Sequence, residues 1–281
     1  MKDFMQICES GLKEKTEKAI RLLKSVKCEC LEVSYSGGKD SDVILELCKM
    51  AGVKYKAIHK CTTIDPPYTL THCKNKGAEI LRPKKSMFEI IKESGFPTRR
   101  SRHCCGFLKE YKVLPIAVHG IRKSESSKRN RRYEEPIICR FYGSKKNKAQ
   151  IVLPILNWSD KDIERFIIQR QIQIHPIYYE QGFLNVRKRL GCIGCPMASD
   201  NGLSGFKRYP KMVKAWIKAG EIWWNTHPNA NSRKKFKNVY ELFVHNVFFN
   251  TYDDFYNAVN DKIAGKIDSK IFLENYFGIK L

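Results

Sequence analysis

The feature that most constrains the fold is a predicted strand that runs directly into a glycine turn and then a helix. Residues 30–35 have the pattern of a buried parallel strand, and a helical pattern begins near Asp40. Between them, Gly37 and Gly38 let the backbone approach a ligand and point successive N–H groups toward it. Because the N-terminal end of the following helix is positive, this turn predicts a phosphate-binding site.

The side chains around the turn favour the same ligand. Lys39 supplies a mobile positive charge, and Ser36 and Ser41 supply hydroxyl donors. The alternative interpretation is a Gly-Gly turn capped by Ser and Asp side chains. The spacing does not match a P-loop, which needs four residues between its first Gly and the Gly-Lys pair, and it lacks the G-x-G-x-x-G of a Rossmann fingerprint.

Ser-Gly-Gly-Lys-Asp-Ser at residues 36–41 resembles the pyrophosphate loop of the adenine-nucleotide alpha-hydrolase superfamily, with all six positions matching. That superfamily includes ATP pyrophosphatases, tRNA thiolation enzymes and phosphoadenosine-phosphosulfate (PAPS) reductases. The resemblance implies a Rossmann-like α/β fold. Independently, strand and helix patterns that alternate as far as residue 155 favour a parallel sheet with helices on both faces.

The remaining patterns predict the loops, regions, helices and strands that surround this site. Pro66 and Pro67 predict a loop at the carboxyl end of a strand, where open α/β sheets bind ligands. We expect the basic tract as far as Lys148 to be a mobile loop. The pattern predicts a domain at 1–198 and a helical C-terminal region at 199–281, whose aromatic side chains form core rather than a base-stacking surface. Helices are expected at 3–27, 69–76, 86–94 and 159–168, and strands at 53–59, 79–82 and 116–121.

The charge distribution predicts a polyanionic partner. The chain has a formal charge of +23, and residues 99–148 alone hold 15 Lys or Arg against four Asp or Glu. A solvated surface would explain part of this excess. Clustered basic residues are, however, the electrostatic footprint of nucleic-acid binding, and a small nucleotide would need only a few of these charges.

Composition favours a globular protein over a disordered or membrane-spanning one. A hydrophobic content of 42% and an aromatic content of 11% are typical of a globular chain. No apolar run approaches the roughly 18–20 residues of a membrane span, and the N-terminal residues lack a secretory apolar segment, so we expect a cytoplasmic protein. In that compartment the eleven cysteines are expected to be thiols or metal ligands rather than disulfides.

Two cysteine pairs have the spacing of a metal site. Cys104 and Cys105 are adjacent, and Cys192 and Cys195 form a C-x-x-C-Pro turn shared by zinc and iron–sulfur sites. Adjacent cysteines chelate one zinc ion poorly, but at the start of a helix both can reach a large cluster. A four-iron cluster is therefore the leading interpretation, with zinc and unligated thiols as the alternatives.

The order of these motifs resembles the PAPS reductase family. Residues 36–41, the tandem cysteines, the Gly120-Ile121-Arg122 segment with Glu125 and Arg129, the Trp158/Asp162 helix and the C-x-x-C turn follow one another as in that family. Within it, the chain is most similar to iron–sulfur adenylyl-sulfate (APS) reductases and to the sulfur-transfer protein of DNA phosphorothioation systems. The resemblance implies a 4Fe-4S cluster on Cys104, Cys105, Cys192 and Cys195. It also implies ATP or another adenine nucleotide held by Ser36, Gly37, Gly38, Lys39, Asp40, Ser41, Asp65, Arg122 and Arg129.

The chain departs from that family at two points. Sulfonucleotide reductases use a nucleophilic cysteine in a C-terminal Glu-Cys-Gly-x-His tail, whereas no cysteine follows Cys195. The usual lysine after the tandem cysteines is displaced, which leaves Lys109 and Lys112 as candidates. We expect most of the seven remaining thiols to be buried: Cys8, Cys28, Cys30, Cys48, Cys61, Cys73 and Cys139. Of these, Cys61 and Cys139 are the two candidate nucleophiles.

These departures favour nucleotide activation over sulfate reduction. The leading hypothesis is an ATP-dependent sulfur-transfer or adenylylating enzyme that acts on nucleic acid, with Lys39, Asp40 and Arg122 as catalytic residues. Mg²⁺ would be held first by Asp40 and then by Asp65, and a cysteine desulfurase or a thiol partner such as thioredoxin would supply sulfur. One alternative is reduction of APS or PAPS with release of sulfite. The other is a non-catalytic nucleic-acid-binding protein with a structural cluster.

Overall fold

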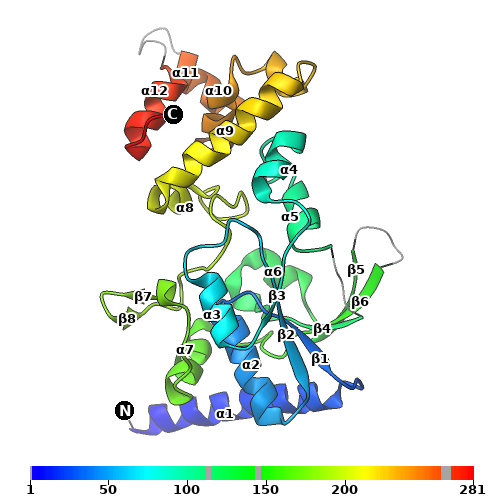
Figure 1. Ribbon diagram of the computed structural model, residues 1–281. Coiled ribbons are helices and arrows are strands. Elements are labelled where there is room, and N and C mark those ends of the chain that lie inside the picture. The colour runs from blue at the N-terminus through cyan, green and yellow to red at the C-terminus, as the bar shows by residue number, and fades with distance from the viewer. Residues whose placement is uncertain (1, 112–114, 143–146, 261–266) are drawn as a thin grey trace. The chain divides into compact units, whose positions relative to one another are not determined.

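The protein is described by a computed structural model that covers residues 2–111, 115–142, 147–260 and 267–281. The chain divides into two compact units whose segments alternate along the sequence (Figure 1). Unit 1 consists of Met1–Cys61, Pro67–Arg82 and Glu110–Leu190. Unit 2 consists of Thr62–Pro66, Pro83–Lys109 and Gly191–Leu281.

Unit 1 is built on a six-stranded sheet with the order β3-β2-β1-β4-β6-β5. All neighbouring strands are parallel except β5, which is antiparallel to β6. From β1 the chain moves outward to β2 and β3 on one side and later to β4 on the other, so the strand order reverses between β1 and β4. Open α/β sheets bind ligands at such a point. The strands are β1 (Leu31–Ser34), β2 (Tyr55–Lys60), β3 (Glu79–Leu81), β4 (Ile116–Val118), β5 (Ile137–Tyr142) and β6 (Asn147–Val152).

Apolar side chains cover both faces of this sheet. In β4, Val118 joins the core beneath α2, whereas its neighbour Ala117 joins a second cluster with Tyr133. Neighbouring strand residues point to opposite faces, so both faces are buried and the predicted α/β class is confirmed. The helices are α1 (Lys2–Ser25), α2 (Lys39–Ala51), α3 (Thr69–Asn75), α6 (Ser127–Arg132) and α7 (Asp160–Gln169).

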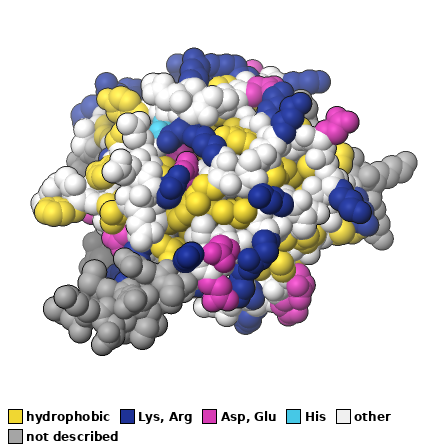
Figure 2. All heavy atoms as spheres, turned by 90° about the horizontal axis from the view of Figure 1, so that it is seen from below, with side chains coloured by type: hydrophobic (Ala, Val, Ile, Leu, Met, Phe, Trp, Pro, Cys, Tyr) yellow, Lys and Arg dark blue, Asp and Glu magenta, His cyan; other side chains and the backbone are white. Residues whose placement is uncertain are grey.

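Capping residues and glycine define the helix ends of unit 1. Ser159 caps α7 in a capping box with Asp162, and α2 ends at Gly52 in the left-handed conformation with φ 64°. α2 packs against both α1 and α7. Figure 2 shows the face that α1 crosses, where Lys and Arg side chains lie among acidic and hydrophobic ones rather than in one patch.

The expectation of a mobile loop as far as Lys148 is wrong for the described part of that tract. It contains α6 and the β5–β6 hairpin, in which Ile138 pairs with Ile151. Ile138 packs against the second apolar cluster, while Phe141 on the same strand is exposed. The exposed face carries Cys139 and Phe141, whereas Arg140 lies on the same face as Ile138, so the sequence shows no apolar–polar alternation here.

Unit 2 is helical and its core is aromatic. Phe206 lies at the centre, with its ring centroid 5.2 Å from that of Trp216 and 5.3 Å from that of Phe243. All three side chains are at most 3% exposed, which confirms that the aromatic residues of this region form core. The helices are α4 (Met87–Ser94), α5 (His103–Leu108), α8 (Leu203–Arg208), α9 (Pro210–Thr226), α10 (Val239–Phe248), α11 (Tyr252–Asn260) and α12 (Ser269–Phe277). Within the described residues, no helix combines the length and apolar character that a membrane span requires.

Two helical glycines should respond oppositely to replacement by alanine. A Cβ atom at Gly220 in α9 would lie 2.2 Å from the Phe96 ring, whereas one at Gly11 in α1 would meet nothing within 4 Å. We expect Gly220→Ala to destabilise the protein by about 1–3 kcal/mol through overpacking. Gly11→Ala should stabilise it by about 0.5–1 kcal/mol through helix propensity. Denaturant unfolding measures both, and equal shifts of the two midpoints would contradict this packing.

Candidate functional site

The glycine turn of unit 1 is shaped by close contacts on its underside. Gly37 has φ 76°, and a Cβ atom there would lie 3.0 Å from Cys73 Sγ. A Cβ atom on Gly38 would lie 3.1 Å from the Tyr178 hydroxyl, and Ser41 Oγ donates to the Gly38 carbonyl at 2.7 Å. Glycine is therefore required at both positions, and the turn leads without a break into α2.

Tyr178 forms the wall beside this turn. Its side chain is 2% exposed, and its hydroxyl hydrogen-bonds with backbone groups of Lys39 and Leu190. Burial raises the pKa of Tyr178, so the phenol is neutral at physiological pH. The Lys39 ammonium lies 5.5 Å from the centre of the Tyr178 ring, which holds this cation at the turn.

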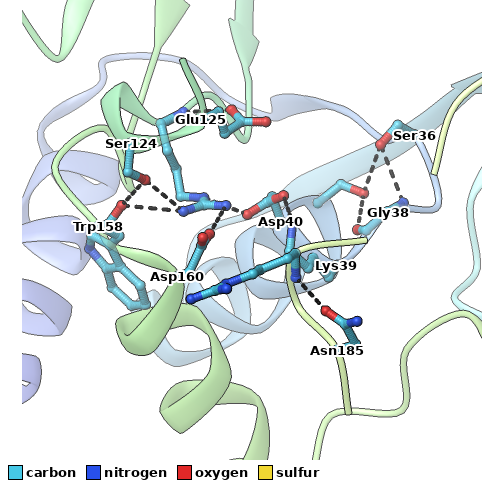
Figure 3. A network of polar contacts seen from close by, with 12 residues as sticks. Ser36, Gly38, Lys39, Asp40, Ser124, Glu125, Trp158, Asp160 and Asn185 are labelled. Atoms are coloured by element: carbon cyan, nitrogen blue, oxygen red, sulfur yellow. Dashed lines mark hydrogen bonds and ion pairs between the residues drawn. The ribbon is translucent and has the colours of Figure 1, made fainter. Parts of the chain in front are cut away.

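Asp40 lies between two cations at the start of α2 (Figure 3). Its carboxylate accepts from Lys39 Nζ and from Arg122 Nε, each at 2.7 Å. Arg122 is 1% exposed, and its guanidinium also reaches Asp160 at 2.9 Å and Ser124 at 2.8 Å. The segment that carries Arg122 can approach because residue 120 is glycine, where a Cβ atom would lie 3.0 Å from the Asp40 backbone.

Two further arginines complete a cationic cluster, which we define as Lys39, Arg122, Arg129 and Arg189. Burial lowers the pKa of Arg129, the positive charge of Arg189 lowers it further, and Asp40 opposes the effect. Arg129 is paired with Glu125, whose carboxylate also accepts from the Arg122 backbone N–H at 3.1 Å. Four cations around one glycine turn form a site suited to a polyphosphate.

The structure brings together the predicted residues of this site, namely the turn at 36–41, Arg122 and Arg129. Sequence reasoning missed Asp160, Tyr178 and Arg189. Asp160 was interpreted only as part of a helix cap, and its pairing with Arg122 joins α7 to the turn. Pairings between distant segments leave no local pattern in the sequence.

The four predicted ligand cysteines lie together in unit 2. Cys104 and Cys105 occupy the first turn of α5, while Cys192 and Cys195 flank a turn closed by a backbone hydrogen bond of 3.2 Å. The pKa of Cys104 is raised, first by its hydrogen bond with Cys105, then by burial and by the nearby Cys192 and Cys195 thiols. No disulfide joins the described cysteines.

An exposed lysine, Lys109, lies beside these thiols. The pKa of Lys109 is raised, first by the negative charge that Cys192 can take, and further by Cys105 and Asp65. Burial raises the pKa of Cys192, while Lys109 and a hydrogen bond with Thr62 oppose that rise. Of the two predicted lysine candidates, Lys109 is thus beside the cysteines, and Lys112 lies outside the described residues.

Asp65 is a residue of unit 2, where its charge acts on Lys109 and Cys192. Its carboxylate accepts from the Thr62 backbone N–H at 2.8 Å and from the Thr62 hydroxyl at 2.6 Å. Its role as a magnesium ligand stays a prediction.

The donor set in unit 2 fits an iron–sulfur cluster. Four thiols with a neighbouring ammonium supply the ligands that thiolate-bound clusters use. A single zinc ion would need its sulfur ligands about 2.3 Å away. In the part of the chain that the structure describes, no three Cys, His, Asp or Glu side chains are arranged to hold a metal ion, so the choice between zinc and a cluster stays a prediction.

The remaining cysteines separate into buried and exposed thiols. Cys48, Cys61 and Cys73 are buried, whereas Cys28, Cys30 and Cys139 are exposed. The expectation that most are buried therefore holds for only half of these six, and the side chain of Cys8 lies outside the description. Of the two candidate nucleophiles, only Cys139 is open to solvent.

His119, at the carboxyl end of β4, makes folding stability depend on pH. Its pKa is lowered to about 4, first by burial and then by the positive charges of Arg140 and Lys60. An unfolded histidine has a pKa of about 6.5, so the unfolded chain binds more protons between these values. We expect unfolding free energy to fall from pH 6.5 to pH 4, with a smaller fall in His119→Gln. Equal slopes in denaturant unfolding would contradict the assignment.

The chain is similar to a known domain family and to two solved structures. Residues 31–198 match the sequence profile of the phosphoadenosine phosphosulfate reductase domain. A phosphoadenylyl-sulfate (PAPS) reductase from Candida auris in a phosphate complex is 14% identical, with a TM-score of 0.46 over 64% of this chain and 93% of that chain. The U34-tRNA thiolase NcsA from Methanococcus maripaludis, solved with its 4Fe-4S cluster, is 12% identical, with a TM-score of 0.44 over 79% of this chain and 82% of that chain.

Among curated proteins, no sequence matches this chain. The profile match spans more than half of the residues and includes the glycine turn, Arg122 and all four cysteines of unit 2. The chain therefore belongs to the phosphoadenosine phosphosulfate reductase domain family.

Proposed function

We propose that this protein is an ATP-dependent sulfur-transfer or adenylylating enzyme that acts on nucleic acid. The observation that carries the proposal is the cationic cluster around the glycine turn, where Lys39 and Arg122 converge on the Asp40 carboxylate. That carboxylate occupies donors that a bound phosphate would use. A triphosphate that displaces it would find backbone N–H groups, hydroxyls and cations already arranged.

The proposed reaction is attack of an acceptor atom on the α-phosphorus of ATP. The new bond forms to the acceptor, the bond to the bridging oxygen breaks, and pyrophosphate leaves. Lys39 and Arg122 would neutralise the charge that develops on the phosphate oxygens, and Arg129 and Arg189 would hold the departing pyrophosphate. Asp40, released from its two cations, would then be free to hold Mg²⁺. A sulfur nucleophile from a partner would finally displace AMP.

The unit 2 cysteines support the sulfur-handling part of the proposal. Cys104, Cys105, Cys192 and Cys195 would hold a 4Fe-4S cluster, which would supply a site for binding or activating sulfur. Lys109 would stabilise the thiolates because its positive charge lies near Cys192, Cys105 and Cys195.

The nucleic-acid part of the proposal is supported by exposed basic residues in unit 1. Lys128, Arg131 and Arg132 on α6 are exposed, and the same helix carries Arg129 of the cationic cluster. A polyanion bound along α6 would therefore reach the phosphate site.

Reduction of APS or PAPS is the second candidate. It requires a thiolate that attacks the sulfate sulfur, and the exposed Cys139 is the thiol of this chain that favours it. Release of labelled sulfite from APS with thioredoxin, and its loss in Cys139→Ser, would support reduction over nucleotide activation.

Replacing Lys39 should abolish nucleotide activation. We expect labelled ATP to give AMP and pyrophosphate in the presence of DNA or tRNA, and Lys39→Met to lower that rate about 10²-fold or more. Lys49→Met is the matched control, because Lys49 lies on the same helix and is exposed. Thin-layer separation of the products measures the rate. A cluster-replete protein that forms no AMP with either polymer would refute the proposal.

The cluster should depend on the four predicted cysteines. We expect the anaerobically purified protein to be brown, with about four irons per chain. Cys192→Ser should lose both colour and iron, whereas Cys139→Ser, which removes an exposed thiol from β5, should keep them. Zinc in place of iron by metal analysis would show that the cluster assignment is wrong.

A further inference from the structure

A small hairpin of unit 1 follows the phosphate site in sequence and stands out from the rest of that unit (Figure 1). It consists of β7 (Tyr179–Glu180) and β8 (Phe183–Leu184). The two-residue turn between them has φ 50° at Gln181 and φ 85° at Gly182. Positive φ at both positions matches the right-handed twist of a tight hairpin.

The hairpin is held firmly at its base. Tyr178 and Val186, which flank it, are 2% and 6% exposed, and the Asn185 backbone N–H donates to the Tyr178 carbonyl at 2.7 Å. The Glu180 carboxylate also accepts from Asn185 Nδ2 at 3.2 Å. A two-stranded hairpin alone is marginally stable, so these anchors fix its conformation.

The hairpin exposes one aromatic ring on each of its faces. Phe183, which pairs with Glu180, is 77% exposed, and Tyr179, which pairs with Leu184 on the opposite face, is 44% exposed. A third exposed ring, Tyr68 at 71%, starts α3, where the neighbouring Pro67 carbonyl lies 3.2 Å from His175 Nε2. Tyr68 has φ 68°, which is a left-handed backbone conformation. Bulky residues rarely adopt it, because it strains the backbone.

Basic residues lie along the chain between Phe183 and the phosphate site. Arg187 and Arg189 follow the hairpin and are exposed. Arg189 also belongs to the cationic cluster, where its charge acts on Arg129. The backbone from Phe183 to Arg189 spans at most about 20 Å.

From this arrangement we infer that the β7–β8 hairpin binds unpaired bases of single-stranded nucleic acid. Phe183 stacks on a base, and Arg187 and Arg189 follow the phosphates toward the cationic cluster. The inference deepens the proposed function, because it rests on nucleic acid as the acceptor and specifies an unpaired segment. An aromatic ring can stack on a base only where the base is not already covered by its neighbours in a duplex, and rings interleaved with arginines are the means by which proteins hold single strands.

The test compares Phe183→Ala with Ile168→Ala, which removes another exposed apolar side chain of unit 1, 62% exposed on α7. Binding of oligothymidylate, oligouridylate and a duplex of equal length is measured by fluorescence anisotropy without ATP. Phe183→Ala should weaken single-strand binding about 5- to 150-fold, the factor that corresponds to loss of one stacked base. Ile168→Ala should leave it unchanged.

Two further variants make the test independent of folding defects. Phe183→Trp should keep the affinity, and its added fluorescence should be quenched when a single strand binds. Arg187→Ala should reduce the dependence of log affinity on log salt by about 0.7, as expected for one phosphate contact to a single strand.

The outcomes separate this inference from the proposed function. Single-strand binding that Phe183→Ala leaves unchanged, or Phe183→Trp fluorescence that does not respond, overturns the hairpin inference while ATP turnover can still be intact. Preference for the duplex overturns it as well. Absence of nucleic-acid binding by the unaltered chain overturns both the inference and the nucleic-acid part of the proposed function.

Discussion

The structure of the phosphate site depends on the buried ion pair between Arg122 and Asp40. A guanidinium that is 1% exposed is stable only if several acceptors replace its water, and here Asp40, Asp160 and the Ser124 hydroxyl do so. These partners come from the start of α2, the start of α7 and the segment after β4. One side chain therefore joins three segments of unit 1 at the point where the strand order reverses.

The same pair explains how the site can be stable in the free protein and still exchange Asp40 for a phosphate ligand. Removing one partner of a buried pair costs about 3–5 kcal/mol, because the remaining charge is left without compensation. A phosphate ligand avoids this penalty, since it supplies negative charge to Arg122 and Lys39 as Asp40 leaves them. The Asp40 carboxylate thus keeps the cations in place in the free protein, and exchange with a phosphate needs little rearrangement of their positions.

Local signals in the sequence predicted most of unit 1. The glycine turn, the Ser159 capping box and the alternation of strands and helices are each determined by residues close together in the chain, and the structure confirms them. The β5–β6 hairpin was missed because apolar residues lie on both of its faces and Arg140 shares a face with Ile138, so no alternation marks the strands. Asp160, Tyr178 and Arg189 were missed because their roles arise from interactions with Arg122, the glycine turn and Arg129 respectively, which lie far away in sequence. Such pairings depend on the assembled sheet.

The charges at the cysteine site of unit 2 are arranged in the opposite way to those at the glycine turn of unit 1. In unit 1 buried cations are neutralised by carboxylates, whereas in unit 2 burial keeps the Cys192 thiol protonated beside the Lys109 ammonium. Metal ligation requires thiolates, so each ligand must lose a proton as a cluster assembles. The Lys109 charge favours that loss, and the resulting thiolates in turn favour the charged form of Lys109. Lys109 and the thiols are therefore more compatible with each other when the cysteines are deprotonated than when they are protonated, which supports the proposal of a cluster over a set of free thiols.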